Sequence, residues 1–331
     1  MNIAVVGCTG MVGRKFIEVL EEKKMYADNF YMFASQKSAG TKITLLGKEY
    51  TVIELTDENI RGKKIDIALF SAGGSVSLRY APVFKEEGAI VIDNSSAWRM
   101  DKDVPLVVPE VNPEDILKHN GIIANPNCST IQAMPVLKPL DEAFKIKRIV
   151  YSTYQAVSGA GVAGYKDLEN GIKGEAPKKF PLPIFSNCLP HIDVFLDNGY
   201  TKEEEKMINE TRKILHRPDL RITATTVRVP VFNGHSESVN VEFEKSVTRE
   251  AVMEILKKAK NVVVKDDTKN AVYPTVLDAN GHDEVWVGRI RQDFSVENGI
   301  NLWIVADNIR KGAASNAIQI AEKVIEFGLV K

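Results

Sequence analysis

A glycine-rich turn close to the start of the chain constrains its fold more than any other feature of the sequence. Residues 3–6 form a short apolar run, residues 7–13 read GCTGMVG, and apolar residues at helical spacing follow through Phe16 and Leu20. Glycines allow a tight turn, and the free N–H groups at a helix N-terminus bind a pyrophosphate. An ordinary strand-to-helix turn is the alternative, but the strand before it and the amphipathic helix after it favour a dinucleotide site.

Further short apolar runs continue this pattern along the first part of the chain. They cover residues 65–70, 89–92 and 121–124, and segments of helical composition such as residues 77–87 separate most of them. Alternating strands and helices predict an α/β domain with a doubly wound, mostly parallel sheet of the Rossmann type.

From about residue 148 the pattern changes to longer strands. The strands that we predict there span residues 148–157, 222–231, 237–245 and 285–291. In the third of them Val239 and Val241 alternate with polar residues, which is typical of a sheet with one solvated face. These segments predict an α+β domain with a largely antiparallel sheet.

The end of the chain returns to the earlier pattern. Residues 302–306 are apolar, and apolar residues at helical spacing run through residues 311–327. We expect this last helix to pack on the first domain. The predicted domains are therefore residues 1–127 with about 307–331, and residues 128–306.

Composition narrows the class of protein. Lys and Arg number 43 and Asp and Glu 44, for a net charge of -1, so the sequence lacks the basic excess that nucleic-acid binders carry. Hydrophobic residues make up 44% and charged residues 26%, as in soluble globular proteins. No signal peptide or membrane-spanning run is visible. The three cysteines stand far apart without a CxxC pair, which indicates a reducing compartment, and we predict a cytoplasmic protein.

The region around the second predicted strand distinguishes NAD from NADP. A site for NAD usually carries an acidic residue here that binds the ribose hydroxyls, but residues 30–41 read FYMFASQKSAGT and contain none. Ser35, Lys37 and Ser38 offer hydroxyls and a cation that suit a 2′-phosphate, so we expect NADP as the cofactor. The alternative is that Lys37 is only a solvated loop residue.

A second glycine-rich segment has a different interpretation. Residues 159–164 read GAGVAG, but no strand–helix–strand unit surrounds them. Tyr165 stands where a P-loop requires lysine. We interpret this segment as a loop beside the cofactor.

Cys128 is the strongest candidate for a nucleophile. It lies in NPNCST, between a predicted strand and a segment predicted as helix. A helix N-terminus stabilises a thiolate through its free N–H groups and its dipole. A small buried cysteine is the commoner alternative, and Pro135 and Pro139 weaken the helix prediction. Cys8 and Cys188 lack this setting, and we assign both to packing.

One histidine and two arginines complete the candidates that residue chemistry suggests. His235 lies in NGHSE between two predicted strands, where an imidazole can act as acid or base, although most loop histidines are only solvated. Arg99 and Arg228 can bind carboxylate or phosphate, and Arg228 falls in the polar set of its strand. A surface ion pair explains either arginine equally well. The sequence contains no HExxH motif and no GxSxG motif, so we predict neither a metal site nor a serine hydrolase.

Several ordered motifs together resemble one known family, the aspartate-β-semialdehyde dehydrogenases, over nearly the whole chain. The motifs are GCTGMVG, SQKSAG, NSSAWRM, VPEVN, NPNCSTIQ, YQAVSGAG, RVPVFNGHSESV and DNIRKGAA. The resemblance implies NADPH-dependent reductive dephosphorylation of L-aspartyl 4-phosphate to L-aspartate 4-semialdehyde, within lysine, diaminopimelate, threonine and methionine biosynthesis. It also implies a homodimer or homotetramer, and we expect the α+β domain to carry the subunit contact.

The resemblance also implies roles for single residues. Cys128 matches the nucleophile that forms a thioester, His235 the acid/base, and Gln155 the residue that positions the substrate. The implied cofactor contacts are Gly7, Thr9, Gly10, Met11, Val12, Gly13, Ser35, Lys37, Ser38, Ser158, Gly159 and Asn308.

The implied substrate-binding residues carry charge. Arg228 matches the arginine that holds the substrate carboxylate, and Arg99 and Lys206 match the pair that binds phosphate. Glu203 matches the carboxylate that meets the substrate amino group. Glu204 and Glu205 stay open for that role, because the KEEEKM stretch permits a shift in register.

Other interpretations also stay open. An N-acetyl-glutamyl-phosphate reductase shares the fold and the thioester chemistry, although SGAGVAG and NGHSES resemble the aspartate enzymes more closely. A malonyl-CoA-type reductase would use another acyl carrier, and glyceraldehyde phosphate dehydrogenase has other residues around its cysteine. A catalytically silent NADP-binding homologue is the alternative outside enzymes, and the intact Cys128 and His235 argue against it.

Overall fold

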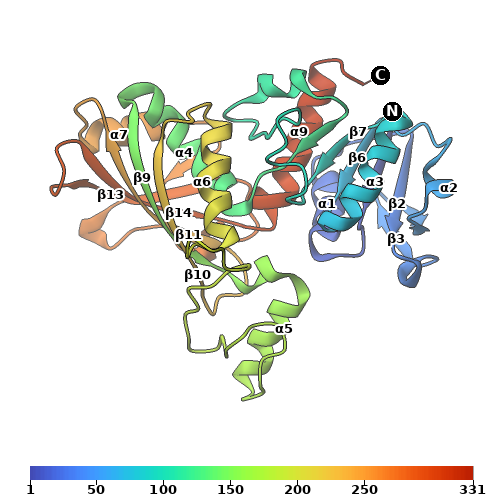
Figure 1. The fold of residues 1–331 in the computed structure, drawn as a ribbon, viewed down its shortest axis with the longest axis horizontal. Coiled ribbons are helices and arrows are strands. Elements are labelled where there is room, and N and C mark those ends of the chain that lie inside the picture. Colours follow the sequence, from blue (N-terminus) through green and yellow to red (C-terminus); the bar gives the residue numbers. More distant parts are fainter. Residues whose placement is uncertain (331) are drawn as a thin grey trace. The chain divides into compact units, whose positions relative to one another are not determined.

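The computed structural model describes residues 1–330, which divide into two compact units (Figure 1). The first unit comprises Met1–Asn127 with residues 313–330, and the second unit comprises Cys128–Gly312. Each unit is built around a six-stranded sheet. Within the described residues, no helix combines the length and apolar character needed to cross a membrane.

The sheet of the first unit is entirely parallel, as predicted. Its strand order is β5-β2-β1-β6-β7-β8. The strands are β1 (Asn2–Val6), β2 (Asn29–Ala34), β5 (Ile53–Glu54), β6 (Ile67–Phe70), β7 (Ile90–Asp93) and β8 (Ile122–Ala124). The order reverses at β1, so the carboxyl end of β1 is the switch point where α/β sheets bind ligands. The turn that carries GCTGMVG follows β1 directly.

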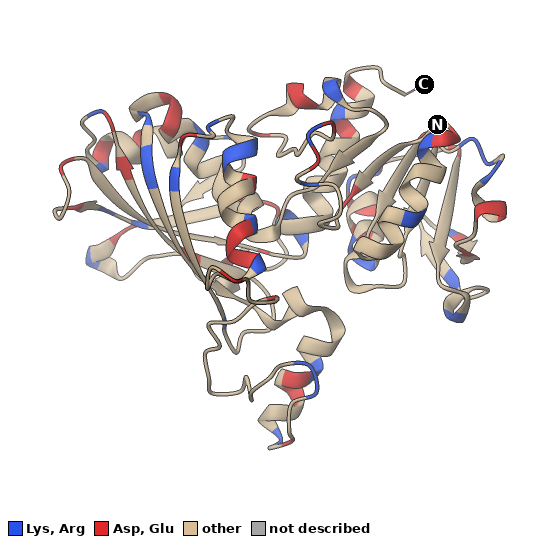
Figure 2. Cartoon of the chain, in the orientation of Figure 1, with Lys and Arg blue, Asp and Glu red and all other residues tan. Residues whose placement is uncertain are grey.

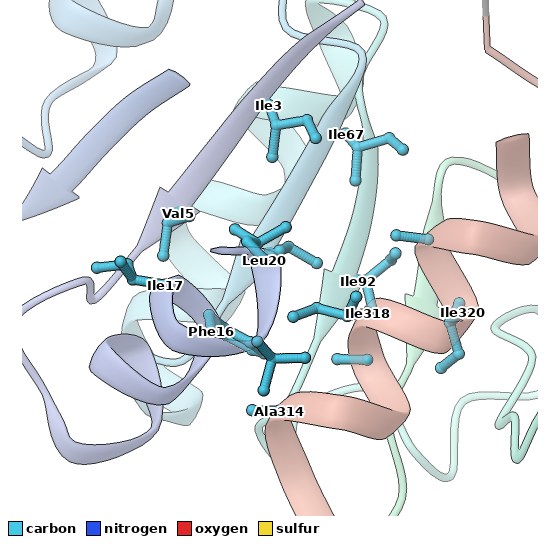
Figure 3. Packing of buried hydrophobic residues seen from close by; sticks show 14 of the residues in the cluster. Ile3, Val5, Phe16, Ile17, Leu20, Ile67, Ile92, Ala314, Ile318 and Ile320 are labelled. Carbon is cyan, nitrogen blue, oxygen red and sulfur yellow. The ribbon is translucent and has the colours of Figure 1, made fainter. Parts of the chain in front are cut away.

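Helices from both ends of the chain complete the first unit. They are α1 (Met11–Glu22), α2 (Asp57–Ile60), α3 (Gly74–Glu86) and α9 (Ser315–Glu326), and a small hairpin joins β3 (Lys42–Leu45) to β4 (Lys48–Thr51). Phe16 and Leu20 of α1 share one buried core with Ile318 of α9 (Figure 3). The last helix therefore packs in the first unit, as predicted. It is regular only from Ser315, because a wider π-type turn forms at Arg310–Ala314.

The sheet of the second unit is mixed. Its order is β10-β9-β11-β14-β13-β12. The strands are β9 (Ile146–Gln155), β10 (Arg221–Arg228), β11 (His235–Phe243), β12 (Val262–Val264), β13 (Val285–Asp293) and β14 (Gly299–Ala306). The inner strands pair antiparallel, as predicted, but both edge strands, β10 and β12, pair parallel to their neighbours.

Helices cover one face of this second sheet (Figure 1). They are α4 (Cys128–Phe144), α6 (Lys202–Ile214) and α7 (Arg249–Leu256). Val239 and Val241 of β11 are fully buried, so the predicted alternation along this strand is confirmed. Thr248 caps α7 by accepting a hydrogen bond from the Ala251 N–H, and the helix ends at Leu256.

Two local features differ from the sequence-based expectation. Pro135 and Pro139 lie inside α4, yet the helix runs for 17 residues without a break. Most of α4 is buried, and that packing compensates for the backbone hydrogen bonds that the prolines cannot donate. The second glycine-rich segment is also no open loop: a 3₁₀ turn at Val157–Ala160 leads into α5 (Gly161–Ile172), which extends away from the sheet of its unit (Figure 1).

The glycine turn after β1 leaves no space for side chains. Gly7 has φ +81°, and a Cβ added to Gly13 would lie 2.0 Å from the Gly7 carbonyl oxygen. Glycine at position 13 therefore lets α1 begin directly against the turn.

We expect Gly13→Ala to lower the free energy of unfolding by about 1–3 kcal/mol, the usual cost of overpacking. Gly74→Ala is the matched control, because a Cβ there meets no atom within 4 Å. Urea denaturation monitored by circular dichroism measures both variants. Equal stabilities for the two variants would contradict this account of the turn.

Candidate active site

Cys128 is the first residue of α4, and its side chain is partly exposed. Its thiol therefore lies at the positive end of the helix dipole, a setting that is typical of nucleophilic cysteines. Gly312 packs against it, since a Cβ added to Gly312 would lie 2.8 Å from the Cys128 Cβ. Local sequence patterns do not indicate this contact, because the two residues are far apart in the chain.

His235 begins β11 and is fully buried, unlike the solvated loop histidine that we considered. Its Nδ1 accepts a hydrogen bond from the Ala156 N–H at 3.0 Å, so the neutral ring carries its proton on Nε2. Nε2 has no hydrogen-bond partner among residues 1–330. Burial, together with the positive charge of Arg228, lowers the pKa of His235 to about 3. The resting imidazole is therefore neutral at pH 7 and offers an N–H donor.

Arg228 ends β10 and is only 5% exposed. The prediction that it belongs to the polar set of its strand is wrong, because it shares the buried face with Ala224 and Thr226. Its Nη1 donates to the Ala156 carbonyl at 2.6 Å, while its Nε has no partner within the described chain. Burial lowers the pKa of Arg228, and the nearby Glu203 and Cys128 oppose that shift. A buried guanidinium with a donor to spare fits the carboxylate of a substrate.

Gln155, Glu203 and Lys206 form a hydrogen-bonded row in the second unit. Gln155 Nε2 donates to Glu203 Oε1 at 3.1 Å, and Lys206 Nζ donates to Glu203 Oε2 at 3.0 Å. Thr153 fixes the Gln155 amide by donating to its oxygen at 3.0 Å. The row brings together three of the predicted residues.

The other two glutamates of this stretch have structural partners. Glu204 accepts from the N–H groups of Thr201 and Thr226, so it caps α6 and ties it to β10. Glu205 accepts from Asn198 and Asn209. Neither meets Gln155.

Ser158 and Asn308, both predicted cofactor contacts, bind each other close to His235. The Asn308 amide donates to Ser158 Oγ at 3.1 Å, and its oxygen accepts from the Gly234 N–H at 2.8 Å. Gly159 lies against the imidazole, since a Cβ added there would lie 3.4 Å from His235 Nε2. The second unit therefore brings these predicted residues together around His235.

The remaining cofactor candidates lie in the first unit. Met11 and Val12 open α1, and Gly10 precedes it without a side-chain cap, so the N–H groups of this turn suit a pyrophosphate. Thr9 Oγ1 donates to Ser38 Oγ at 3.4 Å. Ser35 precedes a 3₁₀ turn at Gln36–Ser38 that includes Lys37 and follows β2. Side chains at the glycine positions would fill the turn, and residues 35–41 directly after β2 contain no acidic residue, so these residues fit NADP.

Arg99 also lies in the first unit and is buried rather than part of a surface ion pair. Its Nε donates to the Asn125 carbonyl at 2.9 Å, and its Nη2 donates to the Asn94 carbonyl at 3.0 Å.

The predictions for the other two cysteines have different outcomes. Cys8 is fully buried, where burial raises the pKa of its thiol to about 11, so its assignment to packing is confirmed. Cys188 is exposed, so its assignment to packing is wrong.

Sequence reasoning missed a buried polar pair behind the site. Glu237 of β11 and Gln132 of α4 are both fully buried, and neither side chain has a hydrogen bond of normal geometry in the described structure. Burial raises the pKa of Glu237 well above its ordinary value of 4.5, and the neighbouring Gln132 amide moderates that rise. The only sequence signal is an acidic residue at an interior position of an alternating strand.

Residues of opposite charge are mixed along the chain. Figure 2 shows Lys and Arg interspersed with Asp and Glu in each unit. Across residues 1–330, no group of three or more His, Cys, Asp or Glu side chains is arranged to hold a metal ion.

A parallel nucleotide-binding sheet, together with a unit that carries a cysteine at a helix N-terminus and a buried histidine, is typical of an NAD(P)-dependent oxidoreductase. Family models agree: residues 2–119 match the semialdehyde dehydrogenase NAD-binding domain, and residues 137–311 match the semialdehyde dehydrogenase dimerisation domain. The chain belongs to the aspartate-semialdehyde dehydrogenase family, whose activity serves aspartate-family amino-acid biosynthesis.

Individual relatives span nearly the whole chain. The aspartate-semialdehyde dehydrogenase of Aquifex aeolicus is 56% identical over 99% of both chains. The crystal structure of aspartate semialdehyde dehydrogenase II from Vibrio cholerae, complexed with ASA, has a TM-score of 0.94 at 47% identity and 98% coverage of both chains. The enzyme of Candida albicans, solved with NADP, has a TM-score of 0.78 at 27% identity and 99% coverage of both chains. The predicted family, oxidoreductase class and fold are confirmed.

The buried carboxyl group of Glu237 predicts a pH-dependent penalty in stability. Above pH 4.5 the unfolded chain releases a proton that the folded protein retains, so stability falls as the pH rises toward the raised folded pKa. We expect Glu237→Gln to raise the free energy of unfolding, relative to the wild type, more at pH 8 than at pH 4. Thermal unfolding across this range measures the effect.

Glu242→Gln, on the same strand, is a control of opposite sign. The hydrogen bond from Lys147 lowers the pKa of Glu242, so its contribution to stability is present above pH 4.5 and is lost as the pH falls through the lowered pKa. The same pH dependence in both variants would contradict the assignment for Glu237.

Proposed function

We propose that this protein catalyses NADPH-dependent reductive dephosphorylation of L-aspartyl 4-phosphate to L-aspartate 4-semialdehyde through a thioester on Cys128. The observation that carries the proposal is the grouping of Cys128, a neutral His235 and a buried Arg228 in one unit. The named relatives support the substrate, since the Vibrio cholerae structure is a complex with ASA.

The first step is attack of the Cys128 thiolate on the acyl carbon, with loss of phosphate. Arg228 binds the substrate α-carboxylate, Glu203 binds its amino group, and Gln155 holds the acyl group beside the thiolate. The Lys206 ammonium stabilises the departing phosphate. The assignment of Arg99 to the same anion also stays a prediction.

The second step converts the thioester to the aldehyde. NADPH, when bound, supplies the hydride that reduces the thioester carbon. His235 donates a hydrogen bond from Nε2 to the oxyanion of the tetrahedral intermediate, and the collapse of that oxyanion re-forms the C=O bond as the Cys128 thiolate leaves. The neutral imidazole that burial enforces is already in the donor state for this step.

The two units divide these tasks. We assign NADP to residues 1–127 with about 307–331, where the glycine turn would hold the pyrophosphate and Lys37 the 2′-phosphate. Residues 128–306 carry the chemistry. These boundaries stay a prediction.

We expect Cys128→Ala to lower the rate of NADPH formation from NADP, phosphate and L-aspartate 4-semialdehyde by more than about 10³-fold, because the thioester cannot form. Cys188→Ala is the matched control, since it removes a thiol that is exposed, and it should keep the wild-type rate. Absorbance of NADPH measures both variants.

Full activity in folded Cys128→Ala would overturn the mechanism. If the wild-type protein instead reduces N-acetyl-glutamyl phosphate or an acyl-CoA, it is a reductase of the corresponding class.

We also propose a homodimer or homotetramer in the cytoplasm, assembled through the second sheet. A cavity of about 580 Å³ opens on the sheet face opposite His235, lined by Tyr154, Leu302 and Trp303. Ser236 and Ser238 also line it, because alternate residues of β11 point to opposite faces. The matching dimerisation domain supports a second copy as the occupant. Three cysteines without a disulfide suit a reducing cytoplasm.

We expect Tyr154→Arg to dissociate the assembly to particles of 36.7 kDa, because it places an unpaired charge in the apolar contact. Tyr26→Arg, at a residue that is 69% exposed in the first unit, should leave the assembly intact. Sedimentation velocity at micromolar protein concentration measures both, and a wild-type protein already at 36.7 kDa would contradict the proposed contact.

A further inference from the structure

The Lys206 ammonium binds two carboxylates of its own chain. Its Nζ lies 2.7 Å from Asp193 Oδ2 and 3.0 Å from Glu203 Oε2. Burial alone would lower the pKa of Lys206, but the two carboxylates raise it above the ordinary value. Burial likewise would raise the pKa of Asp193, and the Lys206 hydrogen bond and charge lower it instead. Both groups are therefore charged at neutral pH.

The segment that carries Asp193 is fixed at both ends. On one side Leu189 exchanges two backbone hydrogen bonds with Arg228, at 2.9 and 2.8 Å. On the other side the Val194 carbonyl accepts from the Lys202 N–H at 2.9 Å, at the start of α6. Asp193 itself has φ +69°, and its Oδ1 accepts from the Val194 N–H at 2.9 Å. The backbone thus presents one carboxylate oxygen to Lys206.

The two carboxylates differ in how firmly they are held. The Glu203 side chain is 6% exposed and also accepts from Gln155, whereas the Asp193 side chain is 33% exposed. Breaking the contact between Lys206 and Asp193 returns a partly hydrated carboxylate to water, which costs less than stranding the buried Glu203. Asp193 is therefore the partner that an incoming anion can displace.

We propose that Asp193 is an internal counter-ion that competes with phosphate for Lys206 and so sets the phosphate affinity of the site. The inference rests on the proposed role of Lys206 in phosphate binding. The ammonium has three N–H donors and gives two of them to Asp193 and Glu203, so phosphate gains a second donor from Lys206 only by replacing the Asp193 carboxylate. The contact between Lys206 and Asp193 keeps the ammonium in place before phosphate arrives, but it lowers the affinity of the site for phosphate.

Asp193→Asn tests the proposal with little change in structure. Asparagine tolerates a positive φ and can accept the Val194 N–H, but it carries no charge. We expect the KM for phosphate in semialdehyde oxidation to fall about 2- to 5-fold, which corresponds to the loss of one partly exposed ion pair. The KM values for NADP and the semialdehyde should not change, and the phosphate effect should shrink as salt concentration rises. Isothermal titration with inorganic phosphate gives the affinity independently of turnover.

Asp197→Asn is the matched control, because it removes the same charge from an exposed position of the same segment. It should keep the wild-type phosphate KM. An unchanged or higher phosphate KM in Asp193→Asn would overturn the competition, and a fall in all KM values would indicate a general structural change and overturn it too.

Lys206→Ala separates this inference from the proposed function. We expect it to raise the phosphate KM, and we expect Asp193→Asn to have no further effect on that KM when the two substitutions are combined. An unchanged phosphate KM in Lys206→Ala would remove the phosphate role of Lys206 and the competition with it. Cys128-dependent formation of NADPH in that same case would leave the proposed reaction standing.

Discussion

The backbone of Ala156 holds the two charged or ionisable groups on which the site depends. Its N–H donates to His235 Nδ1, and its carbonyl accepts from Arg228 Nη1. Ala156 follows directly on Gln155 at the end of β9, so one turn of backbone sets the positions of three side chains on three strands. A backbone group cannot rotate away as a side chain can, and this geometry is therefore fixed before substrate arrives.

Burial determines the protonation states of His235 and Arg228. A fully buried imidazole next to a guanidinium avoids a second positive charge, and so His235 stays neutral. The guanidinium remains charged, and Glu203 lies near enough to compensate part of its desolvation. The same low-polarity interior penalises Glu237, which lies two residues along β11 and has no opposite charge beside it. One strand thus carries a useful buried group and a costly one on the same face.

Much of the fold was readable from local patterns. The turn at residues 7–13, the buried parallel strands and the position of Cys128 at a helix start each depend on neighbours in sequence. The face of Arg228 was predicted wrongly, because polarity along a strand does not reveal whether an arginine is buried. Ala156 and Gly312 could not be found, because their contribution is backbone position. By contrast, the spacing of Thr201 and Glu204 is a capping box, which could have excluded Glu204 from the substrate role in advance.

The alternation of side chains along β11 places the proposed acid/base and the proposed subunit contact on opposite faces of the sheet. His235 and Glu237 point into the interior under the helices, and Ser236 and Ser238 point to the open cavity on the other face. In the proposed assembly a second copy would cover the open face of the strand that begins with His235. In this fold the proposed subunit contact and the proposed chemistry therefore lie on two sides of one strand.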